Sequence, residues 1–310
     1  MSTKWTAAQI PDQSGRTAVV TGANSGLGLV TARELAKAGA RVILACRNVE
    51  KGAVAVREIA VAARGASVTC AALDLGSLAS VREFGARFGA EHGSLDLLIN
   101  NAGVMGAPRR LTEDGFEMQF GTNHLGHFAL TGLLLGHMTR DGARVVTVSS
   151  GAHRMGRMAF DDLQGEKKYG RWSAYGQSKL ANLLFAFELD RRLRAVSSLV
   201  RSVAAHPGYA ATNLQSAAVP AHERFLMSIT NVVLAQSAEK GALPTLYAAT
   251  VPDVEGGEYY GPDGFFEQRG YPEKVDSTPA SKDEAAARRL WEMSEELTGV
   301  RFALSPVAAG

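Results

Sequence analysis

Three features that often reveal a protein's class are scarce in this sequence. Cysteine occurs only at Cys46 and Cys70, both inside apolar runs, which favours two small buried side chains over a disulfide or a metal site. The 33 basic residues are balanced by 31 acidic ones and form no block, which argues against a nucleic-acid partner. Even the apolar run 128–138 is too short to span a bilayer. We therefore expect a cytoplasmic protein without a membrane anchor.

No linker or change in composition divides the 310 residues into separate domains. We expect a single domain over residues 1–310, with a cofactor and catalytic core at 16–195, a substrate lid and sheet completion at 196–260, and a C-terminal extension at 261–310. The sequence is compatible with a homodimer and does not define the oligomeric state.

Short β-branched runs alternate with longer amphipathic ones along the chain. Strands are expected at residues 16–21, 41–45, 67–73, 95–100, 143–149, 199–205 and 257–260, and helices at 27–38, 49–63, 78–91, 115–140, from about 175, at 238–249 and at 282–297. The strands are apolar throughout, as in a parallel sheet that is covered on both faces. The pattern predicts an α/β fold: a doubly wound Rossmann-type domain with a parallel seven-stranded sheet, which binds ligands beyond the carboxyl ends of its strands.

A glycine-rich turn follows the first expected strand, in "VVTGANSGLG". Gly22, Gly26 and Gly28 would let the backbone approach a pyrophosphate at the start of the next helix, and Asn24 and Ser25 would add hydrogen-bond donors. The spacing departs from the G-x-G-x-x-G fingerprint, so a tight connection without a ligand is the alternative.

Arg47 stands at the end of the second expected strand, where many dinucleotide-binding proteins carry an acidic residue that holds the ribose of NAD. With Cys46 before it and the first acid only at Glu50, the guanidinium can bind a 2′-phosphate, which favours NADP(H) over NAD(H). The alternative is a solvated surface arginine.

The turn "TGANSGLG", the segment "NNAG" and the pattern "SS…YGQSK", in this order at successive strand ends, resemble the short-chain dehydrogenase/reductase family. Further segments, among them "TNHLGHF", "HPGYAAT" and "GGEYYGPDG", resemble its retinol dehydrogenase, WW-domain oxidoreductase and protochlorophyllide reductase branch. The resemblance implies a catalytic set of Asn123, Ser150, Tyr175 and Lys179. With the residues of the turn, the implied cofactor-binding set is Gly22, Asn24, Ser25, Gly26, Leu27, Gly28, Arg47, Asp74, Leu75, Asn101, Ala102, Gly103, Tyr175, Lys179, Pro207, Gly208 and Thr212.

Carbonyl reduction requires a proton donor and groups that stabilise the developing alkoxide. Tyr175 can donate the proton, and Lys179, four residues later on the same helical face, would stabilise the phenolate. Two neighbours compete for these roles: Ser149 is the minority choice against Ser150, and Tyr169 lacks a lysine four residues on and is expected to be structural.

Four other features carry weaker signals. His124 and His127 are spaced as a metal pair, but no third ligand accompanies them, and we expect no metal. His206 is expected to pack or to form hydrogen bonds rather than act as a base. The insertion between Ser150 and Tyr175 can line the pocket through Met155 and Met158 or cover a helical face. Residues 213–236 stand where the family has a lid, and Leu214, Phe225 and Met227 indicate either an apolar substrate or core packing.

The leading hypothesis is an NADP(H)-dependent oxidoreductase that interconverts a carbonyl and an alcohol on a medium-sized apolar substrate. A nucleotide sensor without turnover is the alternative, since a Rossmann-type fold does not by itself establish chemistry. An epimerase or dehydratase of the family's extended branch ranks last, because its glycine spacing usually differs.

Overall fold

The computed structural model describes residues 4–209 and 236–304. The strands are β1 (Thr17–Thr21), β2 (Arg41–Cys46), β3 (Val68–Ala72), β4 (Leu97–Asn100), β5 (Arg144–Val148), β6 (Arg201–Ala205), β7 (Tyr259–Pro262) and β8 (Pro272–Lys274). The main helices are α1 (Gly26–Lys37), α2 (Val49–Ala62), α3 (Leu78–Glu91), α4 (Met118–Phe120), α5 (Gly126–Leu134), α6 (Arg171–Ala195), α8 (Ala238–Thr250) and α9 (Glu284–Thr298).

One sheet contains all eight described strands, in the order β3-β2-β1-β4-β5-β6-β7-β8. The first seven run parallel, and β8 pairs antiparallel with β7. From the central β1 the chain moves outward to β3 and then crosses to β4 on the other side of β1. This reversal is the switch point of a doubly wound fold, so the predicted fold class is confirmed.

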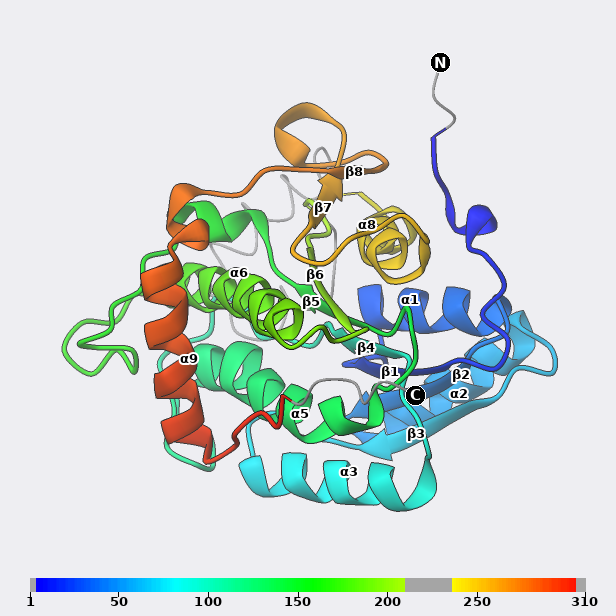
Figure 1. The fold of residues 1–310 in the computed structure, drawn as a ribbon, viewed down its shortest axis with the longest axis horizontal. Coiled ribbons are helices and arrows are strands. Elements are labelled where there is room, and N and C mark those ends of the chain that lie inside the picture. The colour runs from blue at the N-terminus through cyan, green and yellow to red at the C-terminus, as the bar shows by residue number, and fades with distance from the viewer. Residues whose placement is uncertain (1–3, 210–235, 305–310) are drawn as a thin grey trace.

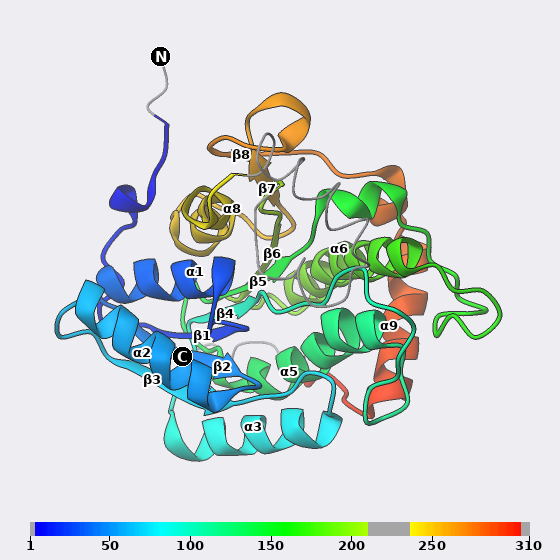
Figure 2. The ribbon, with the colours of Figure 1, turned by 180° about the vertical axis from the view of Figure 1, so that it is seen from behind.

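Helices cover both faces of the sheet (Figures 1 and 2). Apolar side chains of α1, α2 and α8 form one core with one face, and those of α3, α5 and α6 form a second core with the other. The strands are buried on both sides because their sequences are apolar throughout, as in β1, where all five residues are buried.

Two elements differ from the sequence-based expectations. The sheet has eight strands and not seven, because the short edge strand β8 begins with proline and has no apolar alternation to mark it. The single helix expected over 115–140 is broken into α4, a π-helical turn at Gly121–Leu125, α5 and a 3-10 turn. It begins late because the Glu117 carboxylate caps it by accepting hydrogen bonds from the backbone N–H groups of Gln119 and Phe120.

The insertion after Ser150 covers α6 together with α9. Leu163 is buried and Met158 and Phe160 are partly buried against residues of α6 and α9, whereas Met155 is two-thirds exposed. Two roles were expected for the insertion, and Met158 has the second one, because it helps to cover a helical face. Met155, at the end of the turn that follows Ser150, has its side chain exposed to solvent.

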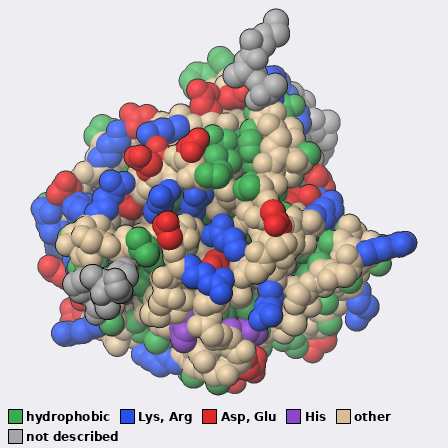
Figure 3. Space-filling view, turned by 45° about the vertical axis from the view of Figure 1, so that its right-hand side comes forward, with side chains coloured by type: hydrophobic (Ala, Val, Ile, Leu, Met, Phe, Trp, Pro, Cys, Tyr) green, Lys and Arg blue, Asp and Glu red, His purple; other side chains and the backbone are tan. Residues whose placement is uncertain are grey.

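The surface carries charges of both signs, which are interspersed on the face that Figure 3 shows. This agrees with the formal net charge of +2. Among the described residues, no helix combines the length and the apolar character that a bilayer crossing would need.

Candidate active site

A cavity of about 260 Å³ lies at the carboxyl ends of the central strands. It gathers fifteen of the expected site residues: Gly22, Asn24, Ser25, Gly26, Leu27, Gly28, Arg47, Asp74, Leu75, Asn101, Ala102, Gly103, Tyr175, Lys179 and Pro207. These residues come from turns after β1, β2, β3, β4 and β6 and from helix α6, so the sheet edge brings together segments that are far apart in the sequence.

The glycine turn packs too closely for side chains. A Cβ on Gly28 would lie 2.5 Å from Nδ2 of Asn101 and 2.7 Å from the carbonyl oxygen of Gly22. Gly22 and Gly26 adopt positive φ angles of 65° and 57°, which favour glycine. Ser25 precedes α1 without capping it through its side chain, so the first N–H groups of the helix remain available for an anion. This cradle fits a dinucleotide pyrophosphate.

Asn101 ties the loop after β4 to the end of β1. Its side-chain amide donates to the carbonyl of Thr21 at 2.8 Å, and the backbone N–H groups of Asn101 and Ala102 both donate to the Thr21 hydroxyl at 2.9 Å. A Cβ on Gly22 would lie 2.9 Å from Cβ of Ala102. The two loops therefore form one rigid wall of the cavity.

Arg47 is exposed at the cavity rim, directly after β2. Its guanidinium has no hydrogen bond or ion pair to the residues that the structure describes. Buried Cys46 precedes it, so no carboxylate stands between Arg47 and the cavity at this strand end. The guanidinium is placed to bind an anionic group of a ligand.

Tyr175 and Lys179 lie on the first turns of α6 and are both buried. The Lys179 Nζ donates to the carbonyl of Val148 at 3.1 Å and lies 5.9 Å from the centre of the Tyr175 ring. Burial lowers the pKa of Lys179 to about 8. Burial also raises the pKa of Tyr175, while a hydrogen bond with Ser150 acts to lower it. In the protein alone the phenol is thus held in its protonated, donor-competent state.

The two neighbouring serines have different partners. Ser149 is buried and its hydroxyl donates to the backbone carbonyl of Lys179 at 2.8 Å, which engages it in the fold. Ser150 is partly exposed, accepts a hydrogen bond from the N–H of Ala152 and reaches the Tyr175 phenol. Ser150 is therefore the serine that can share a carbonyl oxygen with Tyr175.

Asn123 lies in the π-helical turn and joins three segments of the site. Its Oδ1 accepts from the N–H of Val104 at 2.7 Å, and its Nδ2 donates to the Val104 carbonyl and to the Ser178 hydroxyl, both at 2.9 Å. A Cβ on Gly103 would lie 3.1 Å from the Asn123 Oδ1 and 3.6 Å from the Lys179 Nζ. Asn123 thus fixes the loop after β4 against the helix that carries Lys179, and single π-helical turns of this kind often mark functional sites.

Comparisons with known proteins assign this arrangement to a family. The family model described as short chain dehydrogenase matches residues 16–223. The chain belongs to the short chain dehydrogenase family. Retinol dehydrogenase 14 of Mus musculus is 42% identical over 92% of this chain and 86% of its own length, and retinol dehydrogenase 13 of Homo sapiens is 43% identical over 92% and 85%.

A solved structure of a putative uncharacterized protein from Mycobacterium Paratuberculosis shares 47% identity with a TM-score of 0.82, covering 97% of this chain and all of that one. The protein is therefore an oxidoreductase of the short chain dehydrogenase family, in the branch of the retinol dehydrogenases. This family uses nicotinamide dinucleotides as its cofactors.

Several residues that compete with the short chain dehydrogenase set are engaged elsewhere. The Tyr169 hydroxyl donates to the carbonyl of Ala107 at 2.7 Å and lies outside the cavity lining. His127 contacts the Thr21 hydroxyl at 2.9 Å and the Asn123 carbonyl at 3.0 Å, and His124 contacts the Ser294 hydroxyl at 2.8 Å. Burial lowers the pKa of His124 to about 3 and that of His127 to about 4, so both rings are neutral packing residues.

The cavity and the expected set do not coincide fully. Six lining residues are outside the predicted set, and one of them, Ser149, is only the minority alternative to Ser150: Ala45, Leu73, Val104, Thr122, Val148 and Ser149. Most are small or apolar residues at strand ends, which a sequence does not distinguish from core. Asn123, Ser150 and Gly208 stand next to lining residues without lining the cavity themselves. Thr212 and the lid residues Leu214, Phe225 and Met227 lie outside the described residues.

Proposed function

We propose that this protein is an NADP(H)-dependent oxidoreductase that interconverts a carbonyl and an alcohol on a medium-sized apolar substrate. The observation that carries the proposal is that buried Tyr175 and Lys179 line the inner end of a cavity whose outer wall is a glycine cradle. Ser150 follows the lining residue Ser149 and reaches the Tyr175 phenol. Such a cradle suits a pyrophosphate, and a buried acid beside a hydroxyl donor suits a carbonyl oxygen.

The bound cofactor would supply or accept the hydride. Tyr175 would donate its phenolic proton to the carbonyl oxygen, and Ser150 would orient that oxygen through its hydroxyl. The ammonium of Lys179, held on the Val148 carbonyl, would stabilise the phenolate that remains. Asn123 would hold the Val104 backbone and helix α6 in register.

The preference for NADP(H) rests on Arg47. Its guanidinium is exposed at the cavity rim and has no partner within residues 4–209 and 236–304, so a 2′-phosphate could take a bidentate contact without displacing an existing ion pair. Asp74 also lines the cavity, and its Oδ1 accepts a hydrogen bond from the N–H of Gly76 at 2.8 Å, which holds the carboxylate in the turn after β3.

The proposed substrate class rests on two observations. Retinol dehydrogenases 13 and 14, whose names state an apolar polyene alcohol, share more than two fifths of their aligned residues with this chain. Met155, at the end of the turn that follows Ser150, exposes an apolar side chain to solvent. An apolar molecule with its polar end at Tyr175 would gain from covering such a surface.

A substrate panel tests the proposal. The purified protein would be incubated with NADPH or NADH and with retinal, ketosteroids, aromatic aldehydes, short aliphatic aldehydes and charged keto acids, following the loss of reduced nicotinamide. We expect turnover of apolar carbonyls with NADPH in preference to NADH. The proposal would be contradicted if the protein binds NADPH but turns over no carbonyl with NADPH and no alcohol with NADP. That outcome would favour the sensor hypothesis.

A further inference from the structure

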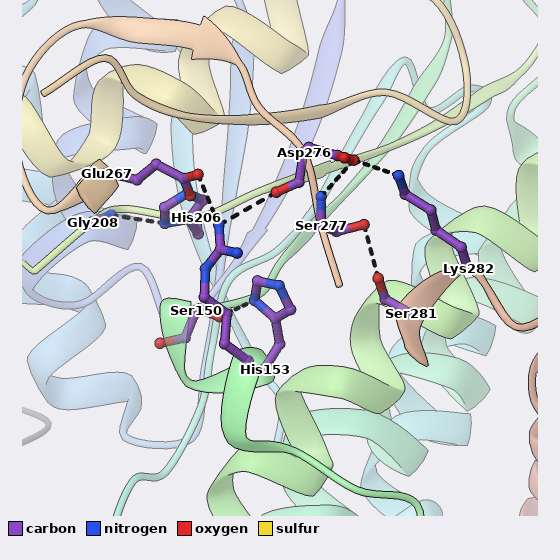
Figure 4. A network of polar contacts seen from close by, with 10 residues as sticks. Ser150, His153, His206, Gly208, Glu267, Asp276, Ser277, Ser281 and Lys282 are labelled. Carbon is purple, nitrogen blue, oxygen red and sulfur yellow. Dashed lines mark hydrogen bonds and ion pairs between the residues drawn. The ribbon is translucent and has the colours of Figure 1, made fainter. Parts of the chain in front are cut away.

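A polar network beside the cavity joins three segments that are far apart in the sequence (Figure 4). Glu267, in the 3-10 turn Phe265–Glu267, accepts a hydrogen bond from the guanidinium of Arg154 at 2.7 Å. Its second oxygen lies 3.1 Å from Nε2 of His206. Arg154 belongs to the turn that follows Ser150, and His206 precedes Pro207, which lines the cavity. Glu267 therefore bridges the Ser150 turn and the segment after β6.

The His206 ring is held in one orientation. The ring is buried and its Nδ1 accepts a hydrogen bond from the N–H of Gly208 at 3.3 Å. Since an accepting nitrogen carries no proton, the neutral ring has its proton on Nε2, which faces the Glu267 carboxylate. A Cβ on Gly261 would lie only 2.0 Å from Nε2, so the ring fills the space against β7.

Other titratable and charged residues surround the His206 ring. His153 and Arg154 come from the turn after Ser150, and the Tyr259 ring packs 5.1 Å from the His206 ring. The contact with His206, together with Arg154, lowers the pKa of Glu267 and keeps it ionised. A carboxylate between an arginine and an imidazole N–H is therefore stable in this position.

The loop that presents Glu267 has a backbone conformation that needs external support. Phe266 and Glu267 have φ angles of 49° and 56°, a region that side chains other than glycine rarely adopt. Core packing does not hold the loop, because Phe265 and Phe266 are 82% and 78% exposed. Polar contacts do: the N–H of Tyr209 donates to the carbonyl of Gln268 at 2.8 Å. Backbone strain of this kind gathers at functional sites.

The loop that carries Glu267 also packs closely against Gly208, which follows the cavity residue Pro207. Gly208 has a φ angle of 64°, and a Cβ there would lie 2.5 Å from the carbonyl oxygen of Gln268. Gln236 closes the same region, since its amide donates to the carbonyl of Pro207 at 2.6 Å. The Glu267 loop, through Gln268, and Gln236 together thus hold the Pro207–Gly208 segment at the cavity.

We propose that Glu267 is a positioning residue for cofactor binding: through His206 it fixes the Pro207–Gly208 backbone at the cavity, and through Arg154 it keeps the Ser150 turn in register with that backbone. This inference rests on the proposed NADP(H) oxidoreductase function. Glu267 does not line the cavity, so its loss should weaken cofactor binding more than it slows the chemical step at saturating cofactor.

The test uses two substitutions at Glu267 and a neighbouring control. Glu267→Gly removes the carboxylate but suits the left-handed backbone, so the fold should keep its melting temperature. Glu267→Gln retains one acceptor oxygen, which can accept from either Arg154 or His206, and its amide NH2 group then faces the other donor. Phe266→Gly relieves the neighbouring strain and leaves the carboxylate in place. We expect the Kd for NADPH, measured by nucleotide fluorescence without substrate, to rise about tenfold in Glu267→Gly, by a smaller factor in Glu267→Gln, and less than about threefold in Phe266→Gly.

Two His206 variants each remove the contact of one ring nitrogen. His206→Asn places an amide oxygen near the position of Nδ1 and can still accept from Gly208, whereas His206→Gln places its amide near Nε2 and cannot. We expect both variants to weaken NADPH binding about tenfold, because His206→Asn loses the contact with Glu267 and His206→Gln loses the contact with Gly208. Wild-type affinity in His206→Asn would show that Glu267 does not act through His206. In steady state, the KM for NADPH should rise in Glu267→Gly and His206→Gln while kcat changes less than about threefold.

The outcomes distinguish this inference from the proposed function. Unchanged NADPH affinity in Glu267→Gly and His206→Gln, beside a wild type that binds NADPH, would overturn the positioning role alone. An equal loss in Phe266→Gly would also overturn it, because the effect would then belong to the loop backbone. A wild type that does not bind NADPH would overturn the proposed function and the positioning role with it.

Discussion

The outer and inner ends of the cavity are lined by different kinds of groups. The outer end consists of backbone and glycine, with Gly22 and Gly28 packed against the Asn101 loop and the exposed Arg47 at its rim. The inner end consists of buried polar side chains, Tyr175 and Lys179, whose ionisation depends on their surroundings. We propose that the two ends have different roles: the outer end would bind the dinucleotide, and the inner end would supply the proton chemistry.

Replacing Lys179 should have the largest effect on turnover and only a small effect on cofactor binding. Lys179→Met keeps an unbranched apolar stem but removes the ammonium that lies 5.9 Å from the Tyr175 ring. We expect turnover to fall at least about 100-fold, the scale of an acid–base contribution, while the Kd for NADPH changes less than about tenfold. Steady-state kinetics and equilibrium binding on the same preparation measure both. Turnover within a few-fold of the wild type would show that the inner end does not depend on this charge.

Reversing the charge of Arg47 should change the preference between NADPH and NADH, which we attribute to the outer end of the cavity. In Arg47→Asp the ratio of kcat/KM for NADPH to that for NADH should fall roughly 10- to 100-fold, because a charge-assisted contact with a phosphate is replaced by repulsion. The matched control is Arg57→Asp, an exposed arginine on α2 that does not line the cavity. If both variants keep the wild-type ratio, cofactor preference is set elsewhere.

The buried lysine also predicts a smaller effect on stability. Burial lowers the pKa of Lys179 from 10.5 to about 8, so between these values the unfolded chain binds more protons than the folded protein. Folding stability should therefore rise with pH above about 8, by about 1 kcal/mol from pH 7 to pH 9 through this group. Lys179→Met should lose that increment. Urea unfolding of both proteins at the two pH values measures it, and equal pH slopes would contradict the depressed pKa.

Much of the outer end could be predicted from the sequence because it is local. The turn with Gly22 and Gly28 follows a strand and begins a helix within ten residues, and Arg47 directly follows the next strand, so spacing alone places them at one sheet edge. Tyr175 and Lys179 could be paired for the same reason, since residues four apart share a helical face.

The parts that could not be predicted depend on contacts between distant segments. Val148 lines the cavity from the end of β5 and Val104 from the loop after β4, and nothing in their side chains sets them apart from core residues. The contact between His206 and Glu267 joins residues 61 positions apart and depends on a loop backbone that sequence patterns do not reveal. The edge strand β8 carries no strand pattern at all.

The most direct test of the proposed division is Tyr175→Phe, assayed for turnover and for NADPH binding in the same experiment. The substitution removes one oxygen from a buried ring and leaves Lys179 and the glycine cradle in place. We predict a loss of turnover of at least about 100-fold with NADPH affinity within a few-fold of the wild type. Near-normal turnover of any carbonyl accepted by the wild type would contradict the assignment of Tyr175 as the proton donor.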